Sequence, residues 1–389
     1  AAAVVTTAEV APLLALDALP LAPAVLLTDV LAQGPALAAP VALALQGTAL
    51  VQFTSGSTAA PKGVVLSHAN IDANANAIGK GLGVTESDVG VSWLPLYHDM
   101  GLIGMLLAAV YARVELILMS PVLFLKRPTA WLEAISAYRG TISFAPNFAY
   151  DLCLRRVKPS QLPTLDLSSW RIAGCGAEPI RAEVLRGFAE RFAVTGFKAA
   201  AFVPSYGLAE HSLAVAFSRD GLKVDQVDAW RLGRDSRAVP VTNGSPAVRV
   251  VGCGRPFPGH DVRIIDEDGQ PLPERHVGQI VASGPSVMKG YFNDPDATAE
   301  TLEDGWLHTG DLGYIAGGEL FVCGRTKDLI IRQGRKYHPP DLESAIADVE
   351  GVRRSGVVVF GVNRLTEADR VIAVLEARAS AAPVDMVEH

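Results

Sequence analysis

The stretch Val51–Asn70, VQFTSGSTAAPKGVVLSHAN, decides how the rest of the chain is interpreted. An apolar run enters a loop of small and hydroxylic residues, which ends in Pro61, Lys62 and Gly63. Glycine lets the backbone approach a ligand closely, consecutive N–H groups and hydroxyls suit phosphate oxygens, and lysine supplies the opposite charge. The stretch therefore predicts a polyanion site. It is not a Walker A loop, because the spacing Gly-x-x-x-x-Gly-Lys-Ser/Thr cannot be laid over it, so kinase or GTPase mechanics do not follow.

A helix is expected soon after this loop. Ser67 is a candidate N-cap, because the apolar residues that follow it recur at helical spacing: Ile71, Ala75, Ile78 and Leu82. We therefore expect the phosphate-type loop to lie between a strand and a helix, which is a common position for phosphate sites in α/β proteins.

Length and composition limit the class of protein. A chain of 389 residues exceeds what one core usually needs, so two or three domains are expected. The net charge of −7 and the lack of a dense basic run argue against nucleic acid as the main partner. The cysteines are far apart in the sequence, which predicts reduced thiols in a cytoplasmic protein: Cys153, Cys175, Cys253 and Cys323.

A transmembrane segment is not expected. Only Gly101–Met119 approaches membrane-spanning length, and Arg113 and Glu115 interrupt it, so a buried helix followed by a strand is predicted. The Ala/Leu-rich start has no basic segment before it, which argues against a signal peptide. The lack of an initiator methionine is consistent with a start inside a longer protein.

Strand-like runs that end in a loop and precede a helical pattern recur through the middle of the chain. Val91–Gly101 (VSWLPLYHDMG) carries His98 into such a loop, and Thr141–Pro146 and Trp170–Ile180 have the same form. Taken alone, a single histidine is more often a hydrogen-bonded turn residue than a functional one. The recurrence predicts an α/β fold with a mixed or parallel sheet and with loops gathered at the C-terminal ends of its strands.

The composition changes in the second half of the chain. Charged and polar residues fill Ser218–Val251, which we interpret as a surface excursion. Cys253–Gly284 alternates apolar and polar residues around DEDGQ, a hairpin signal that predicts a smaller antiparallel unit. From Asp328 a further unit is expected, with a strand, a helix at Asp341–Val349 and two more strands.

Five stretches together resemble the adenylate-forming superfamily, which contains acyl-CoA synthetases, firefly luciferase and nonribosomal-peptide adenylation domains. They are TSGSTAAPKG (54–63), LPLYHDMG (94–101), SYGLAE (205–210), GWLHTGDLG (305–313) and GRTKDLIIRQGRKYHPPDLE (324–343). Within the superfamily, SWLPLYHDMGL, SPVLFLKRP, FAPNFAYDLCLRR and PSYGLAEHSLAVAF look most like the fatty acyl-AMP ligases, which load acyl chains onto acyl carrier proteins.

The resemblance implies the adenylate-forming enzyme fold. Residues 1–250 would form the layered α/β part of a large adenylation domain, with a polar insertion at about 219–250. Residues 251–324 would form a small β-rich subdomain, and residues 325–389 a hinge and the start of a mobile α+β C-terminal domain. In fatty acyl-AMP ligases such an insertion hampers the domain rotation used for CoA chemistry; an ordinary variable surface loop is the alternative.

The reaction that the resemblance implies is attack by a fatty-acid carboxylate on the α-phosphate of ATP, which gives acyl-AMP and pyrophosphate. Both reactants are anionic, so the site must neutralise charge and align the attack. Glu210 would bind Mg²⁺, although an exposed carboxylate at a helix start is its plain structural alternative. The residues that would hold the phosphates are Thr54, Ser55, Gly56, Ser57, Thr58 and Lys62.

The nucleoside is expected to lie between several of these motifs. Tyr206, next to Gly207, would stack on the adenine. Asp311 would accept both ribose hydroxyls, and Arg325 would add a ribose or phosphate contact. The residues whose backbone would line the purine are Gly176, Ala177 and Glu178.

The acid and the hinge are assigned in the same way. The family context places His98 near the acyl carboxylate, as a donor that positions it. Lys327 matches the residue about which the C-terminal domain swings, and an exposed turn lysine is the alternative. Three further residues are candidates for bordering an acyl tunnel, although aromatic stripes are usually core: Phe144, Asn147 and Phe148.

The chain departs from the family pattern in three places. Only the residues up to Leu50 precede the glycine loop, where family members have a further N-terminal subdomain, and no lysine follows Lys336 where the family carries one. Truncation at both ends is therefore expected. Ala209 stands where threonine is common, as it often does in fatty acyl-AMP ligases.

Three functional hypotheses remain open from the sequence. The first is a fatty acyl-AMP ligase that acts with an acyl carrier protein or a polyketide or peptide synthase domain. The second is a fatty acyl-CoA synthetase, to which GPSVMKGYFNDPDAT (284–298) is equally well suited. The third is a non-catalytic nucleotide-binding remnant, motivated by the missing lysine.

Overall fold

The structure is a computed structural model, and it describes residues 3–8, 11–13, 24–31, 43–54, 61–242, 245–332, 335–347, 349–364 and 367–377. By its internal contacts the chain separates into two units, residues 1–44 and 45–389. The first contains two parallel strands, β1 (Ala3–Thr6) and β2 (Ala24–Leu27), and the short helix α1 (Thr28–Leu31). Every predicted site residue belongs to the second unit. The domain boundaries expected near residues 250 and 324 stay predictions.

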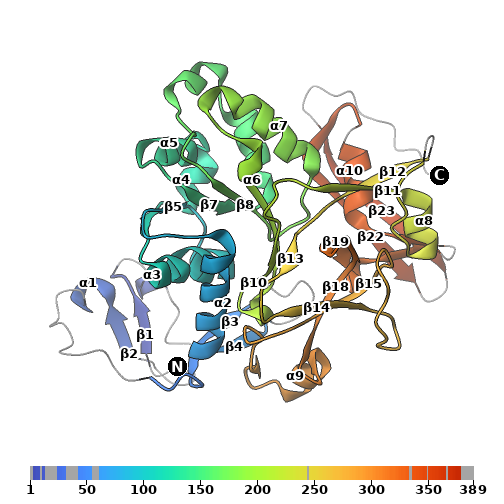
Figure 1. Cartoon of the computed structure of the whole chain (residues 1–389), viewed down its shortest axis with the longest axis horizontal. Helices are drawn as coiled ribbons and strands as arrows, with labels where there is room; N and C mark the ends of the chain where they lie inside the picture. Colours follow the sequence, from blue (N-terminus) through green and yellow to red (C-terminus); the bar gives the residue numbers. More distant parts are fainter. Residues whose placement is uncertain are drawn as a thin grey trace. The chain divides into compact units, whose positions relative to one another are not determined.

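The largest sheet of the second unit has the strand order β13-β10-β9-β8-β7-β5-β6 (Figure 1). The strands from β6 to β9 in this order are parallel to one another, and β10 is antiparallel to both β9 and β13. Their bounds are β5 (Val89–Ser92), β6 (Glu115–Leu118), β7 (Ile142–Ala145), β8 (Ile172–Cys175), β9 (Phe202–Gly207), β10 (Ala214–Phe217) and β13 (Arg255–Pro256). The predicted α/β fold with a mixed sheet is confirmed.

Helices surround this sheet and complete its core (Figure 1). β7 and β8 are buried along their whole length, as expected for strands covered on both faces. Trp131, Tyr150 and Trp170 are buried side by side beneath the helices, with the Trp131 and Trp170 ring centroids 5.1 Å apart. The helices are α2 (His68–Leu82), α3 (Ala108–Ala112), α4 (Pro121–Lys126), α5 (Thr129–Ala137), α6 (Asn147–Arg156) and α7 (Ala182–Phe192).

The apolar stretch Gly101–Met119 forms a helical segment and a strand, as predicted, but the expected burial holds only for the first part of the helical segment, because no residue of Ala108–Ala112 is buried. A π-helical segment (Met100–Leu107) continues into α3, and β6 follows. Across the described residues, no helix combines the length and the apolar character needed to cross a membrane.

The glycine-rich loop joins two strands, so the prediction that it passes from a strand into a helix is wrong. β3 (Thr48–Phe53) pairs antiparallel with β4 (Gly63–Ser67), and β4 also pairs with β16 (Gly290–Tyr291). The run after Lys62 is rich in β-branched and apolar residues, and its Val64 and Leu66 are fully buried. It therefore forms a return strand before α2 begins.

Ser67 is the N-cap of α2, as the sequence predicts. Its hydroxyl accepts a hydrogen bond from Asn70 N at 3.1 Å, and the Asn70 side chain accepts one from Ser67 N at 2.9 Å. Asn70 also donates to Pro285 O and Val287 O, both at 2.8 Å, which ties the start of α2 to the segment that leads into β16.

We expect Ser67→Ala to lower the free energy of unfolding by about 1 kcal/mol, the usual cost of a lost N-cap. Denaturant unfolding monitored by circular dichroism measures the change. Ser87→Ala, in an exposed turn, serves as the control and should leave the stability within about 0.5 kcal/mol of the parent. Equal losses in the two variants would contradict the capping role.

A smaller antiparallel sheet follows the main one, as predicted. β14 (Asp261–Ile265) and β15 (Gly278–Ser283) pair across the DEDGQ turn, where Asp266 N donates to Gln270 O at 3.0 Å and Gly269 has φ of 76°. The sheet continues through β18 (Trp306–Ala316) to β17 (Leu302–Glu303), and β19 (Glu319–Arg325) also pairs with β18. Helix α9 (Pro295–Thr301) lies between β16 and β17 in the chain.

The polar segment after Ser218 is more than a surface excursion. It forms an antiparallel pair, β11 (Val224–Asp228) and β12 (Ala247–Val251), with α8 (Ala229–Asp235) between them. Four of its apolar residues are buried against Tyr314, Ala316 and Phe321 of the smaller sheet: Val227, Leu232, Ala238 and Val250. Charged and polar residues outnumber these apolar ones, so the composition of the segment did not indicate a packed unit.

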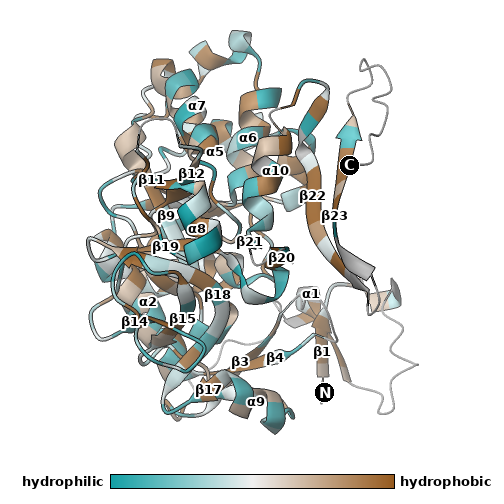
Figure 2. Ribbon diagram, turned by 90° about the vertical axis from the view of Figure 1, so that its right-hand side faces the viewer, coloured by the Kyte–Doolittle hydropathy of each residue, from teal (hydrophilic) through white to brown (hydrophobic). Residues whose placement is uncertain are grey.

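The C-terminal part has the predicted helix and later strands, but two strands precede the helix where one was expected. The later strands were predicted at Gly356–Val362 and Val371–Ala377. β20 (Ile330–Arg332) and β21 (Arg335–Tyr337) precede α10 (Pro339–Ala347), and a long hairpin of β22 (Val352–Arg364) and β23 (Glu367–Ala377) follows. β22 begins four residues before the predicted strand. Figure 2 shows the apolar character of β22, whose Val357 and Val359 are buried in a cluster with residues of α10, while the intervening Val358 is exposed.

Candidate functional site

Hydrogen bonds close the base of the glycine-rich loop. Thr54 N donates to Lys62 O at 2.9 Å, and Phe292 N, directly after β16, donates to Gly63 O at 2.7 Å. The structure therefore brings the two ends of the loop together. The predicted phosphate-binding residues between them, Ser55, Gly56, Ser57 and Thr58, lie outside the described residues.

Tyr291 links two of the predicted catalytic residues. Its hydroxyl donates to Glu210 Oε1 at 2.8 Å, and Lys62 Nζ lies 4.8 Å from the centroid of its ring. Lys62 ends the glycine loop and Glu210 follows β9, so β16 brings both motifs to one place. The sequence analysis assigned no role to Tyr291, and its only signal was a position in the GPSVMKGYFNDPDAT stretch.

The structure also brings together Tyr206, Asp311 and Arg325. The Tyr206 hydroxyl donates to Asp311 Oδ2 at 2.6 Å, and Arg325 Nε lies 3.4 Å from Asp311 Oδ1. Asp311 on β18 stands opposite Arg325 on β19 in the strand register, which explains the second contact. The adenine-stacking and ribose-binding roles of these residues stay predictions.

Opposing effects act on the pKa of the Asp311 carboxyl. Burial raises its pKa above the ordinary value, and the negative charges of Glu210 and Asp328 act in the same direction. The hydrogen bond from Tyr206 and the charge of Arg325 oppose this rise in pKa.

Glycines set the backbone at the ends of β8 and β9. A Cβ on Gly176 would lie 2.7 Å from Ser205 Oγ, and one on Gly207 would lie 2.0 Å from Leu213 O, so neither position accepts a side chain. Ala177 has a left-handed φ of 67°, which turns the chain away from the strand. The contact of Gly176 and Ala177 with a purine stays a prediction.

Glu178 holds the start of α6. Its Oε1 accepts a hydrogen bond from Phe148 N at 2.5 Å, a favourable place for a carboxylate because helix N-termini carry unpaired N–H groups. Burial raises the pKa of Glu178, and the Phe148 hydrogen bond opposes that rise. The side chain therefore contacts the start of α6, and the predicted backbone contact of Glu178 with the purine stays a prediction.

His98 pairs with its neighbour Asp99. His98 Nδ1 lies 2.7 Å from Asp99 Oδ1, and 47% of the His98 side chain is exposed. Asp99 Oδ1 also accepts from Met100 N at 2.7 Å at the start of the π-helical segment, and Gln52 on β3 donates to Tyr97 O at 2.9 Å. The hydrogen bond that the ring donates to Asp99 raises the pKa of His98 above its ordinary value of 6.5, against the opposing effect of burial.

We expect NMR titration to find a pKa above 6.5 for His98 and a lower pKa in Asp99→Asn. The raised pKa keeps the imidazole of His98 charged to higher pH than in the unfolded chain. The pair therefore stabilises the folded state fully below the unfolded pKa of His98, and this stabilisation is lost as pH rises through the folded pKa. Asparagine keeps an oxygen that can accept from Met100 N and removes only the charge. In Asp99→Asn the alkaline fall in kcat/KM for the acid should therefore move to lower pH. An unchanged His98 pKa would contradict the pairing.

The residues suggested for an acyl tunnel have structural contacts. Phe144 and Asn147 are buried, and Phe144 lies so close to Gly174 that a Cβ there would be 2.0 Å from its ring. Asn147 Oδ1 accepts from Arg181 N at 3.0 Å. Phe148 is 37% exposed and contacts Trp93, with ring centroids 6.0 Å apart. Their tunnel role stays a prediction.

Lys327 follows Arg325 by two residues in the chain. It occupies a short 3-10 turn (Thr326–Asp328) between β19 and β20, and its side chain is exposed. The turn is where a hinge was predicted, and its function as a hinge stays a prediction.

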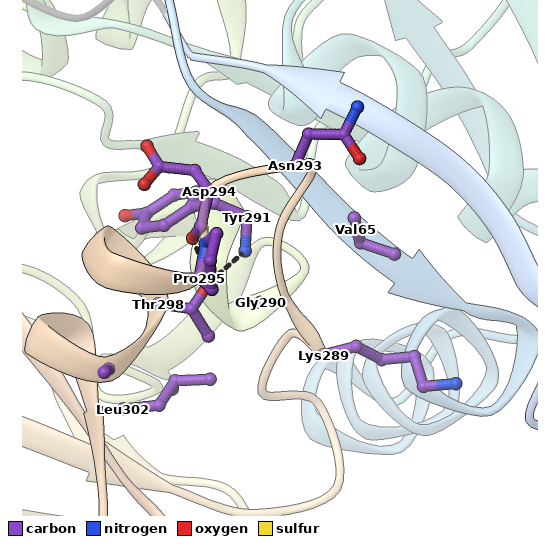
Figure 3. A pocket seen from close by; sticks show the side chains of 10 residues that line it. Val65, Lys289, Gly290, Tyr291, Asn293, Asp294, Pro295, Thr298 and Leu302 are labelled. Atoms are coloured by element: carbon purple, nitrogen blue, oxygen red, sulfur yellow. Dashed lines mark hydrogen bonds between the residues drawn. The ribbon is translucent and has the colours of Figure 1, made fainter.

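A cavity of about 540 Å³ opens beside β16 and α9 (Figure 3). It is lined by Val65, Lys289, Gly290, Tyr291, Asn293, Asp294, Pro295, Thr298, Ala299 and Leu302. None of the predicted site residues lines it. Tyr291 is therefore the link between this cavity and the contacts of Glu210 and Lys62.

The profile of the family described as "AMP-binding enzyme" matches residues 3–292. The chain belongs to the AMP-binding enzyme family. A solved structure, published under "Structural and Functional Studies of Fatty Acyl-Adenylate Ligases from E. coli and L. pneumophila", is 41% identical with a TM-score of 0.89, over 97% of this chain and 69% of that one. This member of the AMP-binding family thus has the adenylate-forming fold, and its similarity to fatty acyl-AMP ligases is confirmed.

Two curated relatives each match more than four fifths of this chain. The "Putative acyl-CoA synthetase" of Caulobacter vibrioides is 44% identical over 84% of this chain and 58% of its own length. The medium-chain-fatty-acid–[acyl-carrier-protein] ligase JamA of Moorena producens is 37% identical over 85% of this chain and 58% of its own length. The chain thus covers little more than half the length of each of these relatives.

Proposed function

We propose that this chain activates a fatty acid with ATP, forming an acyl-adenylate and releasing pyrophosphate. The observation that carries the proposal is the meeting of Lys62 and Glu210 at Tyr291, at the base of the glycine-rich loop. A cation and a carboxylate at one place suit a triphosphate that arrives with a divalent cation. The names of the related fatty acyl-adenylate and fatty-acid ligases support the same reaction.

The residues would share the work of bringing two anions together. Lys62 and the loop residues 54–58 would hold the β- and γ-phosphates and then the departing pyrophosphate. Asp311 would accept the ribose hydroxyls, while Tyr206 and Arg325 orient its carboxylate. His98 would donate a hydrogen bond to the carboxylate of the acid, so that its oxygen faces the α-phosphate. The bond between the α- and β-phosphates breaks as the acyl–phosphate bond forms.

Glu210 would bind Mg²⁺ together with the nucleotide. The described part of the chain holds no group of three His, Cys, Asp or Glu side chains able to hold a metal, so phosphate oxygens and water would complete the coordination. Such coordination is usual for Mg²⁺, which proteins commonly bind with one or two carboxylates together with substrate phosphates. When bound, the ion supplies charge neutralisation at the leaving pyrophosphate.

We further propose that the acyl group passes to an acyl carrier protein or to a carrier domain of a polyketide or peptide synthase. The name of JamA, an acyl-carrier-protein ligase, supports this acceptor. The name of the Caulobacter relative favours CoA as the alternative acceptor. A cytoplasmic location belongs to the same proposal, and the four free cysteines support it.

The full-length gene product should be incubated with Mg²⁺, ATP, labelled pyrophosphate and saturated fatty acids of increasing length. Acid-dependent ATP–pyrophosphate exchange and an acyl-AMP detected by mass spectrometry are expected. The loss of exchange without acid is the internal control. Adding phosphopantetheinylated carrier protein or CoA then compares the acceptors. Abundant acyl-CoA with no accumulation of acyl-AMP would favour the CoA ligase, and no acid-dependent exchange would overturn the proposal.

A further inference from the structure

Tyr291 touches the two residues on which the proposed function depends. Its hydroxyl hydrogen-bonds to Glu210 and its ring faces the ammonium of Lys62. These are two different interactions made by two separable parts of one side chain. A phenylalanine keeps the ring and loses the hydroxyl, whereas a leucine loses both.

Backbone contacts fix the place from which Tyr291 acts. In β16, Tyr291 stands opposite Val64 of β4, next to the glycine loop. Tyr291 N donates to Thr298 Oγ1 at 2.8 Å (Figure 3), and Thr298 Oγ1 donates to Asp294 O at 2.7 Å. A Cβ on Gly290 would lie 2.7 Å from Thr298 Cγ2, so the strand can approach α9 only with glycine there. The backbone of Tyr291 is therefore fixed by β4 and α9, which lie outside the loop.

We propose that Tyr291 is a positioning residue for the phosphate and metal site, an inference that rests on the proposed function of Glu210 and Lys62. Its hydroxyl occupies Glu210 Oε1 and so orients the carboxylate, leaving the other oxygen to face the cation that accompanies the nucleotide. Its ring holds the Lys62 ammonium close to the loop until phosphate oxygens replace the ring as its partner.

The strengths of the two contacts suit these tasks. A hydrogen bond to a charged group is stronger than one between neutral groups, which is enough to select one orientation of a carboxylate. A cation–π contact at a partly exposed site is weaker, so a triphosphate readily displaces the ring. An ordinary tyrosine hydroxyl is protonated at neutral pH, so the Tyr291 hydroxyl is available as the donor to Glu210.

Two variants of Tyr291 separate these effects. Calorimetry should measure the binding of a non-hydrolysable ATP analogue with Mg²⁺ and, separately, with EDTA. For Tyr291→Phe we expect binding with Mg²⁺ to weaken about 5- to 10-fold and binding in EDTA to stay unchanged. The Mg²⁺ concentration for half-maximal ATP–pyrophosphate exchange should rise by a similar factor, while the KM for the fatty acid does not change. Tyr291→Leu should weaken binding in EDTA as well.

The chain offers a matched control for the hydroxyl. Tyr314 also donates its hydroxyl to a carboxylate, Asp225 Oδ2, at 2.9 Å, in the cluster beneath β11 and β12. Tyr314→Phe removes the same kind of hydrogen bond away from the site. It should leave both binding measurements unchanged, and its melting temperature shows how much stability such a loss costs.

Each other outcome is decisive. Wild-type binding by Tyr291→Phe under both conditions overturns the inference. Equal weakening with Mg²⁺ and in EDTA also overturns it, because a merely structural role would affect both alike. Wild-type protein that binds the analogue with Mg²⁺ but shows no acid-dependent exchange contradicts the proposed function, and the calorimetric comparison of Tyr291→Phe still decides the inference.

Discussion

Asp311→Asn is expected to raise the KM for ATP about 100-fold while the protein stays folded. The carboxylate accepts from Tyr206 and pairs with Arg325, and it would accept the ribose hydroxyls of the nucleotide. Asparagine keeps the shape but loses the charge and replaces one acceptor oxygen with a donor. Losing two hydrogen bonds to a charged group at about 1.5 kcal/mol each corresponds to roughly this factor. Titration of ATP in the ATP–pyrophosphate exchange assay measures it.

Asp225→Asn is a close structural control for this variant. Asp225 Oδ2 accepts from the Tyr314 hydroxyl at 2.9 Å and from Arg275 at 2.9 Å, so it has the same kinds of partner as Asp311. We expect Asp225→Asn to lower the melting temperature and to leave the KM for ATP unchanged. If both variants raised this KM alike, the effect would be a general loss of packing, and Asp311 would have no particular role toward the ribose.

Glu210→Gln should lower kcat for acid-dependent exchange by about 1,000-fold, the larger end of what one electrostatic group contributes to catalysis. Glutamine is isosteric and still offers an oxygen to the Tyr291 hydroxyl. The change therefore removes the negative charge that would bind Mg²⁺ and little else. Exchange should be measured over a range of Mg²⁺ concentrations, because a variant that lacks the ligand responds weakly even at high concentration.

The control for this variant is Glu183→Gln. Glu183 is a half-exposed carboxylate on α7 that pairs with Arg249 at 2.6 Å, away from the glycine loop. It should keep the kcat and the Mg²⁺ dependence of the parent. A Glu210→Gln enzyme with a normal Mg²⁺ response would show that Glu210 is only a partner for Tyr291 and does not bind the cation.

Much of the large sheet could be predicted because its signals are local. The buried strands Ile142–Ala145 and Ile172–Cys175 are apolar over their whole length, and α2 has a capping residue and helical spacing. The return strand Gly63–Ser67 was missed because five residues before a helix can belong to either element. Its pairing with both β3 and β16 makes the segment a strand, and β16 is too distant in the sequence for a local pattern to indicate this pairing.

The chemistry of the site could be predicted from motifs, whereas the contacts within it could not. Lys62, Glu210 and Asp311 each stand in a recognisable stretch of residues. The bond from Tyr291 to Glu210 joins residues 81 positions apart, and no spacing rule connects them. Glu178 shows the same limit, because no spacing rule predicts the hydrogen bond that its side chain accepts from Phe148 N.

The packing of β11, α8 and β12 on the smaller sheet has a consequence for protein engineering. Excising residues 224–251 to create a shorter relative would uncover Tyr314 and Phe321, whose stacked rings have centroids 5.0 Å apart. It would also leave Arg275 without Asp225. Newly exposed aromatic surface of this kind promotes aggregation. A soluble shortened protein would therefore need polar replacements at Tyr314 and Phe321 in the same design.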